Sequence, residues 1–265
     1  MSEPFGHQTL RNRYRFEGEL QLLSPLRLSS GRASDTTDAP LMRDKAARPY
    51  VPGSSLRGAI RSELERVLAG LGSAAGVTSC ILFSPDDSQG ACVTASKTKQ
   101  KELQDEEKKG GDEAAAYLEN CLCDLCKLFG SPHYASRLIF EDACPVPKAE
   151  LQTTVRDGVG IDRDTGAASE NVKFNYEVLE VGPKLKFALQ VENLTETDRK
   201  LINLVLALLR QGIFVGGKRA AGLGRIQLCD APVVTGFESP DELWSALQKG
   251  ESPFHALAWS GGAGC

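Results

Sequence analysis

The sequence of 265 residues lacks the marks of a membrane or secreted protein. It contains no apolar run long enough to span a bilayer, and its first residues show no signal-peptide pattern. We therefore expect a cytoplasmic protein that does not enter a membrane. Because the cytoplasm keeps thiols reduced, the eight cysteines favour metal binding over disulfides.

Several motifs of nucleotide and nucleic-acid chemistry are also missing. The glycine-rich stretch at residues 216–225 lacks the Gly-Lys-Ser/Thr of a nucleotide-binding P-loop. No His-x-Glu accompanies the cysteines, which argues against a deaminase zinc site. The aromatic signature of RNA-recognition strands is absent as well. The histidines His7, His133 and His255 are scattered, so we expect each of them to be structural.

What is present describes a globular chain with a local basic track. Hydrophobic residues make up 41% of the chain and charged residues 25%, which is enough for a packed core. The net charge of −4 argues against indiscriminate nucleic-acid binding. Residues 199–229 nevertheless contain no acid and six cations: Arg199, Lys200, Arg210, Lys218, Arg219 and Arg225.

The hydrophobic pattern predicts alternating strands and helices. Strands are expected at residues 15–24, 137–142, 176–181, 184–193 and 225–228, with Gly182-Pro183 as a hairpin turn. Helices are expected after Pro52, capped by Ser54 or Ser55, and after the capping box at residues 195–198. Glycine and aspartate turn signals predict a loop at residues 151–169, and residues 230–265 are expected to be peripheral. This order predicts an α+β fold of the ferredoxin-like type, with one sheet face packed on two helices.

A cysteine-rich segment interrupts this order. Residues 80–126 hold five of the eight cysteines and a charged run that predicts a solvated helix or a disordered loop. We place the insertion at residues 77–130. Four cysteines predict a structural tetrahedral Zn²⁺ site, with Cys121 as an alternative ligand: Cys80, Cys92, Cys123 and Cys126. Buried free thiols are the alternative, and a redox motif fits less well because Cys-x-x-Cys does not open the helix of a βαβ unit.

Two places favour phosphate binding. Residues 216–225 combine four glycines with three cations, so their peptide N–H groups could cradle a phosphate. The alternative is a mobile hairpin turn. The helix that opens near Ser54 and Ser55 offers backbone N–H groups and a favourable dipole, with Arg57 and Arg61 on the next turns. The alternatives there are ordinary capping and a solvated basic face.

Four blocks of sequence, in the expected order, resemble the RAMP superfamily, in particular the backbone subunits of type III CRISPR effector complexes. One block alone would be weak, but four in register are specific. They are residues 26–31 with 38–44, residues 50–58, residues 123–131 with 156–163, and residues 216–225.

The resemblance implies a single RAMP domain over residues 1–265, with a ferredoxin-like palm and a thumb hairpin at residues 150–176. It implies copies or paralogues that stack along a guide RNA, beside other type III subunits, and cut bound target RNA at regular intervals in antiviral defence. The position that matches the cutting aspartate is Asp38, with Asp35 as backup; by itself Asp38 is an ordinary turn residue. Cleavage would use Mg²⁺ or Mn²⁺.

The expected RNA contacts follow from the basic track, the helix start and the thumb. Ile161 is the apolar residue expected to press against an unstacked base. The full set is Ser54, Ser55, Arg57, Arg61, Arg156, Ile161, Arg163, Lys218, Arg219 and Arg225. The alternatives are a scaffolding paralogue that does not cut, a stand-alone processing ribonuclease, and a zinc-stabilised protein interaction module. A processing ribonuclease usually needs a histidine pair, which this chain lacks.

Overall fold

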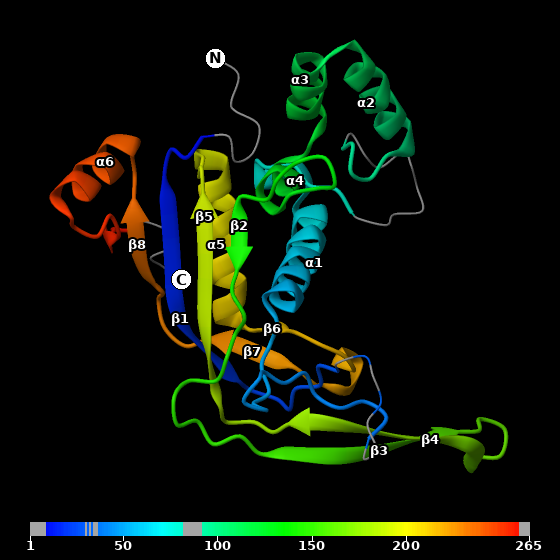
Figure 1. Ribbon diagram of the computed structural model, residues 1–265. Coiled ribbons are helices and arrows are strands. Elements are labelled where there is room, and N and C mark those ends of the chain that lie inside the picture. The colour runs from blue at the N-terminus through cyan, green and yellow to red at the C-terminus, as the bar shows by residue number, and fades with distance from the viewer. Residues whose placement is uncertain (1–8, 30, 32, 34–36, 82–91, 260–265) are drawn as a thin grey trace.

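The computed structural model describes residues 9–29, 31, 33, 37–81 and 92–259 (Figure 1). Its main sheet is antiparallel, has seven strands and is built around β1 (Arg13–Leu22). The strand order is β2 (Leu138–Phe140), β5 (Lys184–Glu192), β1, β7 (Arg225–Leu228) and β6 (Ile213–Phe214). The predicted α+β class is confirmed, and the sequence of core elements is β1, α1, β2, β5, α5, β7.

One face of the sheet is apolar and covered by helices. Alternate side chains of β1 are buried, as the strand period of two requires: Tyr14, Phe16, Leu20 and Leu22. Two helices, α1 (Gly53–Leu71) and α5 (Glu196–Gln211), pack their apolar stripes beside this sheet (Figure 1). The core therefore lies between one sheet face and two helices.

The opposite face of the sheet is charged. Ion pairs cross it between neighbouring strands, such as Arg13 with Glu192 at 2.7 Å and Lys184 with Glu19 at 2.8 Å. The Lys184–Glu19 pair is exposed and contributes little to stability, whereas Glu192 is buried, and both pairs balance the charge of the face. This face is therefore neither an aromatic platform nor a basic track.

The two main helices begin in different ways. For α5 the predicted capping box is present, with Thr195 and Asp198 each accepting from the other's backbone N–H. The prediction that Ser54 or Ser55 caps α1 was wrong, because the capping position is Pro52 and no side chain caps the helix. The Gly53 N–H donates to Asp142 Oδ1 at 2.8 Å instead. A Cβ on Gly53 would lie 2.2 Å from the Phe140 carbonyl oxygen, so only glycine fits there.

A second sheet of two strands projects from the main body as an arm (Figure 1). Strands β3 (Thr153–Ile161) and β4 (Ala168–Leu179) pair antiparallel over their length, with an irregularity between Val159 and Ile161. The loop predicted at residues 151–169 was therefore wrong. So was the hairpin turn at Gly182-Pro183, because β4 pairs with β3 and not with β5.

In the described residues of the cysteine-rich segment, three α-helices lie beyond the end of α1 (Figure 1). A 3₁₀ turn, η1 (Gly72–Ala75), leads out of α1. The charged run forms α2 (Lys97–Lys109), in which Leu103 is the buried residue, so the prediction of a solvated helix is confirmed. Two further helices, α3 (Gly111–Cys121) and α4 (Asp124–Phe129), return the chain to β2.

The C-terminal part belongs to the core more closely than predicted. Strand β8 (Val233–Phe237) pairs with β1 and buries Val234 and Phe237, and β9 (His255–Ala256) pairs with β8. The Trp259 ring meets Phe16 edge to face at a centroid distance of 4.8 Å. The peripheral assignment of residues 230–265 thus holds for α6 (Pro240–Lys249), which buries no residue, and not for β8 or Trp259.

Candidate functional site

Asp38 lies where the arm joins the main body. The Asp38 N–H donates to Asn175 Oδ1 and the Asn175 N–H donates to Asp38 Oδ2, both at 2.8 Å. One residue further on, the Glu177 N–H donates to the Ala39 carbonyl at 3.1 Å, so the Asp38 loop runs along the outer edge of β4. The Asp38 side chain is exposed, and within the described residues its Oδ1 has no hydrogen-bond partner. Asp35 lies outside the described residues.

The glycine loop folds tightly against the segment before the Asp38 loop. It contains one 3₁₀ turn, η3 (Arg219–Ala221), and the Gly217 N–H donates to the Arg27 carbonyl at 2.9 Å. Gly224 has φ +86°, and a Cβ there would lie 1.9 Å from the Val215 carbonyl oxygen. Five of the ten N–H groups of the loop donate to backbone carbonyls, namely those of Gly217, Ala221, Gly222, Leu223 and Gly224. Part of the loop is therefore held by its own backbone hydrogen bonds, and the phosphate cradle at its start stays a prediction.

Lys218 connects the glycine loop to the arm. Its backbone is left-handed, with φ +57°, and its ammonium lies 4.3 Å from the Phe174 ring centroid and 4.6 Å from that of Tyr176. The two rings stack with centroids 6.2 Å apart, and the Arg27 guanidinium lies 5.3 Å from the Tyr176 centroid. Arg27 Nε is buried and has no hydrogen-bond partner among the described residues. The junction therefore gathers cations and aromatic faces, a combination that suits nucleic acid.

The arm carries the remaining predicted thumb residues at different heights. Near its base, Arg156 forms an ion pair with Glu180 at 3.1 Å. Toward the tip, Arg163 is exposed and Ile161 is 56% exposed, so the apolar side chain stands in solvent. Between them, a Cβ on Gly158 would lie 2.4 Å from the Phe174 ring, so this glycine lets the ring lie across β3.

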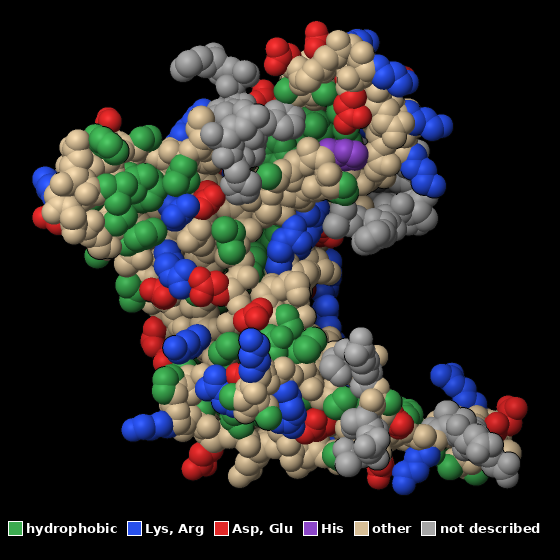
Figure 2. Space-filling model, in the orientation of Figure 1, with side chains coloured by type: hydrophobic (Ala, Val, Ile, Leu, Met, Phe, Trp, Pro, Cys, Tyr) green, Lys and Arg blue, Asp and Glu red, His purple; other side chains and the backbone are tan. Residues whose placement is uncertain are grey.

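The surface is hollowed between these two ends of the molecule. Figure 2 shows a concave side bounded by the α2–α3 segment above and the arm below, with Lys and Arg side chains along its inner wall. Of the other predicted loop cations, Arg219 and Arg225 are exposed. Arg225 also donates to the Gln211 carbonyl at 3.3 Å.

The predicted contacts on α1 separate into surface and interior groups. Ser54 is exposed, Ser55 is half-buried, and Arg57 is half-buried with Nη2 donating to the Phe129 carbonyl. Arg61 is buried, and donates to Glu65 Oε1, the Gly130 carbonyl and Cys126 Sγ. The Arg61 guanidinium already has three acceptors inside the protein, so RNA contact by this residue stays a prediction that its burial does not favour.

The four predicted cysteines come together in the interior. The sulfur atoms of Cys80, Cys92, Cys123 and Cys126 all lie within 4.8 Å of one another, and all four residues are buried. Tetrahedral Zn–S bonds of about 2.3 Å place neighbouring sulfurs about 3.8 Å apart, so the cluster is close to the size that the ion needs. Cys121 lies outside this group of four and accepts from Lys99 Nζ at 3.7 Å.

The thiols of the cluster perturb one another strongly. Hydrogen bonding within the cluster, above all from Cys123, lowers the pKa of Cys92 and holds that of Cys126 at about 7. The hydrogen bond to Cys126 raises the pKa of Cys123. A divalent cation would allow all four sulfurs to be thiolates. Four such ligands close the shell and leave no open position for chemistry.

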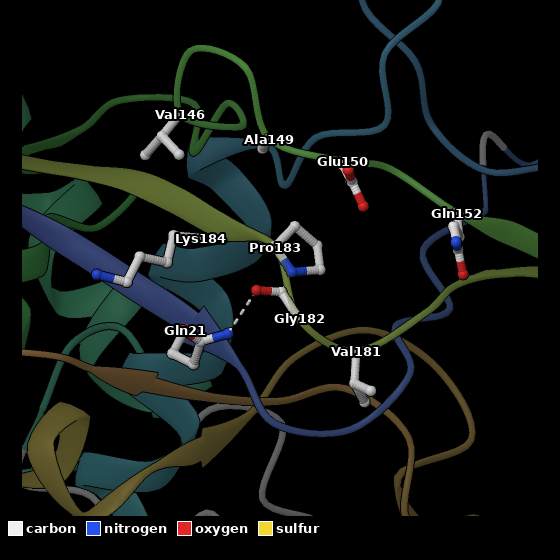
Figure 3. A pocket seen from close by; sticks show the side chains of 9 residues that line it. All are labelled: Gln21, Val146, Ala149, Glu150, Gln152, Val181, Gly182, Pro183 and Lys184. Atoms are coloured by element: carbon white, nitrogen blue, oxygen red, sulfur yellow. Dashed lines mark hydrogen bonds between the residues drawn. The ribbon is translucent and has the colours of Figure 1, made fainter.

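A cavity of about 450 Å³ near the base of the arm has no comparable chemistry (Figure 3). Glu150 and Lys184 are its charged lining residues, and Gln21 donates from Nε2 to the Gly182 carbonyl at 2.8 Å. That bond fixes the turn that enters β5. Neither histidine nor cysteine lines this cavity among the described residues.

Sequence reasoning missed four residues of the junction: Arg27, Phe174, Asn175 and Tyr176. The alternation Phe174-x-Tyr176 is a strand signal, but the nearby turn residues concealed it. Arg27 and Asn175 carry no local signal, because their importance comes from contacts with residues far away in the sequence.

Comparison with known proteins identifies related sequences. Over 245 aligned residues the chain is 25% identical to the protein named CRISPR system Cms endoribonuclease Csm3 of Methanocaldococcus jannaschii. The alignment covers 85% of this chain and 82% of that protein. Within the described residues, no helix is long and apolar enough to span a bilayer. The family model of the RAMP superfamily matches residues 19–227, and this chain therefore belongs to the RAMP superfamily.

Proposed function

We propose that this chain is a guide-RNA-binding backbone subunit of a type III CRISPR effector complex that cuts bound target RNA. The main sheet with α1 and α5 would be the ferredoxin-like palm, and the β3–β4 arm would be the thumb. The observation that carries the proposal is the position of Asp38, at the junction of the arm with the main body, in a chain similar to an endoribonuclease. The partners would be guide RNA, target RNA, further copies or paralogues, and other type III subunits.

The hollow side of the molecule would hold the RNA. Lys218, Arg219 and Arg225 of the glycine loop would contact phosphates through their side chains, and Ser54, Ser55 and Arg57 would do so at the start of α1. Arg156 and Arg163 would extend the basic path along the arm. Ile161 would press against an unstacked base, because its apolar side chain already stands in solvent.

Asp38 would serve the cutting step. A ribose 2′-OH attacks the adjacent phosphate in line with the leaving 5′-oxygen, a geometry that a kinked nucleotide allows and an A-form duplex does not. The exposed carboxylate could accept the hydroxyl proton through Oδ1. Its Oδ2 is held by the Asn175 N–H at 2.8 Å, which orients the group.

Asp38 also fits a divalent cation, although minimally. A carboxylate oxygen is a ligand that Mg²⁺ and Mn²⁺ accept, and water and substrate phosphate commonly complete such a shell. When bound, the cation would neutralise charge at the phosphate. A structural Zn²⁺ in the four-cysteine cluster would stabilise the fold without taking part in the cutting.

The experiment is cleavage of target RNA by the assembled complex with Asp38→Asn. This substitution keeps an oxygen for the Asn175 N–H and removes the charge. We expect cutting to fall about 10²–10⁴-fold while RNA affinity stays within about twofold. Asn175→Ser, in which the backbone N–H is retained, is the matched control and should keep most of the cutting. Full cleavage by the Asp38→Asn complex would refute the catalytic assignment.

A scaffolding subunit that does not cut is the second candidate. The paired hydrogen bonds between Asp38 and Asn175 support it, because they give the carboxylate a structural task at the edge of β4. In that case wild-type and Asp38→Asn complexes would show the same low cutting and the same RNA affinity. A zinc-stabilised protein interaction module would instead show no salt-sensitive RNA affinity at all.

A further inference from the structure

Helix α4 connects the cysteine cluster to a second cavity. Cys123 and Cys126 lie at the start and in the middle of this six-residue helix, which ends at Phe129 and Gly130. A cavity of about 480 Å³ opens there, within the range of roughly 300–1,000 Å³ that is usual for ligand sites. It lies between α1 and the turn that follows α4. Its lining includes Arg57, Arg61, Thr94, Phe129, Gly130 and Ser131.

Two arginines from α1 hold the C-terminal end of α4. Arg57 donates to the Phe129 carbonyl, and Arg61 donates to the Gly130 carbonyl at 3.0 Å. Cations are favourable at this end of a helix, where carbonyl groups lack partners within the helix. Both guanidinium groups also lie 5.9 Å from the Phe129 ring centroid. The position of α4 therefore sets the position of both arginines.

Arg61 also reaches the cluster itself. Its Nη2 donates to Cys126 Sγ at 3.0 Å, and the side chain is 7% exposed. Four thiolates around one Zn²⁺ carry a net charge of about −2 in the interior, which a neighbouring guanidinium compensates. Glu65 balances Arg61 from the other side at 2.9 Å. Arg61 therefore contacts both the cluster and the cavity, so a change in metal occupancy of the cluster can alter the position of side chains in the cavity.

The cavity offers a cation for a ligand. Arg57 has no acidic partner among the described residues, and burial together with the charge of Arg61 lowers its pKa. The Thr94 hydroxyl lines the same cavity and lies beside the Cys126 thiol. An anion with several acceptor oxygens would satisfy the Arg57 guanidinium.

We propose that this cavity binds a phosphate group through Arg57, and that Arg61, as a positioning residue, couples its affinity to metal in the four-cysteine cluster. The metal would fix the position of α4, and α4 in turn positions the Arg57 guanidinium that binds the phosphate. That the phosphate belongs to RNA rests on the proposed function. The coupling itself rests on the contacts of Arg61 and Arg57.

The test uses the full chain with and without zinc and two probes, a 20-nucleotide single-stranded RNA and inorganic pyrophosphate. Probe affinity is measured in both metal states at one salt concentration, and zinc affinity by competition with a chelator in the presence and absence of each probe. Coupling between two sites is reciprocal, so zinc should raise probe affinity by the same factor, about 5-fold or more, by which the probe raises zinc affinity. Unchanged zinc affinity in the presence of a bound probe overturns the proposal.

Three variants separate the steps. Arg57→Gln should lower probe affinity about 5-fold and leave zinc affinity without a probe unchanged. Arg61→Lys, the conservative change, should weaken zinc about 10-fold and remove the coupling. Arg66→Gln, on the exposed side of the same helix, is the matched control and should change neither quantity. If Arg66→Gln lowers probe affinity as much as Arg57→Gln does, probe binding depends on the general positive charge of the surface and the proposal is wrong.

The outcomes distinguish this proposal from the proposed function. A chain that binds pyrophosphate with zinc-dependent affinity but binds no RNA would refute the RNA-binding function and support the coupled phosphate site. A chain that binds RNA with an affinity independent of zinc would support the RNA-binding function and refute the coupled phosphate site.

Discussion

The cysteine cluster and the Asp38 junction differ in almost every physical respect. The cluster is buried, its sulfurs lie within 4.8 Å of one another, and a buried cation donates to one of them. At the junction Asp38 is exposed, and two hydrogen bonds at 2.8 Å tie it to Asn175. A closed shell stabilises structure, whereas an exposed carboxylate with a free oxygen can meet a substrate. The chain therefore separates the site that we propose for a structural metal from the site that we propose for chemistry.

The largest expected effect is loss of the cluster. Cys126→Ser removes one of four ligands and the acceptor of Arg61, so it should abolish stoichiometric zinc and lower the free energy of unfolding by more than about 4 kcal/mol. Zinc analysis and chemical denaturation measure the two quantities. Cys121→Ser, just outside the cluster, is the matched control and should cost less than about 1 kcal/mol. Equal effects of the two variants would show that the cluster is not a metal site.

An intermediate effect is expected in the glycine loop. Gly224→Ala puts a Cβ 1.9 Å from the Val215 carbonyl oxygen at φ +86°, so it should lower the free energy of unfolding by more than about 2 kcal/mol. Gly222 has φ +78° with open space around it, so Gly222→Ala should cost only about 1–2 kcal/mol. The difference between the two, measured by denaturation, isolates the backbone contact. If the costs are equal, the loop is looser than its contacts indicate.

The smallest expected effect concerns one cation at the junction. Lys218→Gln keeps the left-handed backbone but removes the charge over Phe174 and Tyr176. RNA affinity should fall a few-fold, and the slope of log affinity against log salt should shrink by about 0.7, the value for one phosphate contact on a single strand. Lys249→Gln, on the exposed helix α6, is the control for net charge. An identical salt slope in both variants would remove Lys218 from the RNA path.

Much of the core could be predicted because its signals are local. The alternation around Phe16 and Leu20 marked β1, and Thr195 with Asp198 marked the start of α5. The cysteine set was also readable, since few arrangements other than a metal site bring four cysteines into one segment of a reduced protein. Zinc itself stays a prediction, as do the residues proposed for RNA contact and the catalytic role of Asp38.

The wrong predictions concern residues whose contacts lie far away in the sequence. Gly158 resembled a turn signal, but it is a place in β3 where the Phe174 ring needs room. Arg61 resembled a surface cation, because its helix position does not show that Cys126 and Gly130 lie against it. Val234 and Phe237 were assigned to a peripheral tail, since nothing nearby indicates that β8 pairs with β1.

The way in which the arm is attached predicts that its stability falls from base to tip. Its base is tied to the body by backbone hydrogen bonds such as Leu179 N–H to the Leu26 carbonyl at 2.9 Å. Toward the tip, β3 and β4 pair with each other and with no other strand of the described residues. Because an isolated two-stranded ribbon is only marginally stable in water, amide hydrogens should exchange with solvent faster with each step away from Leu179. An arm that is fixed at its base and flexible at its tip can adapt its conformation to the surface of a bound partner. Val155, Val159 and Ile161 are exposed on the arm and could contact such a partner.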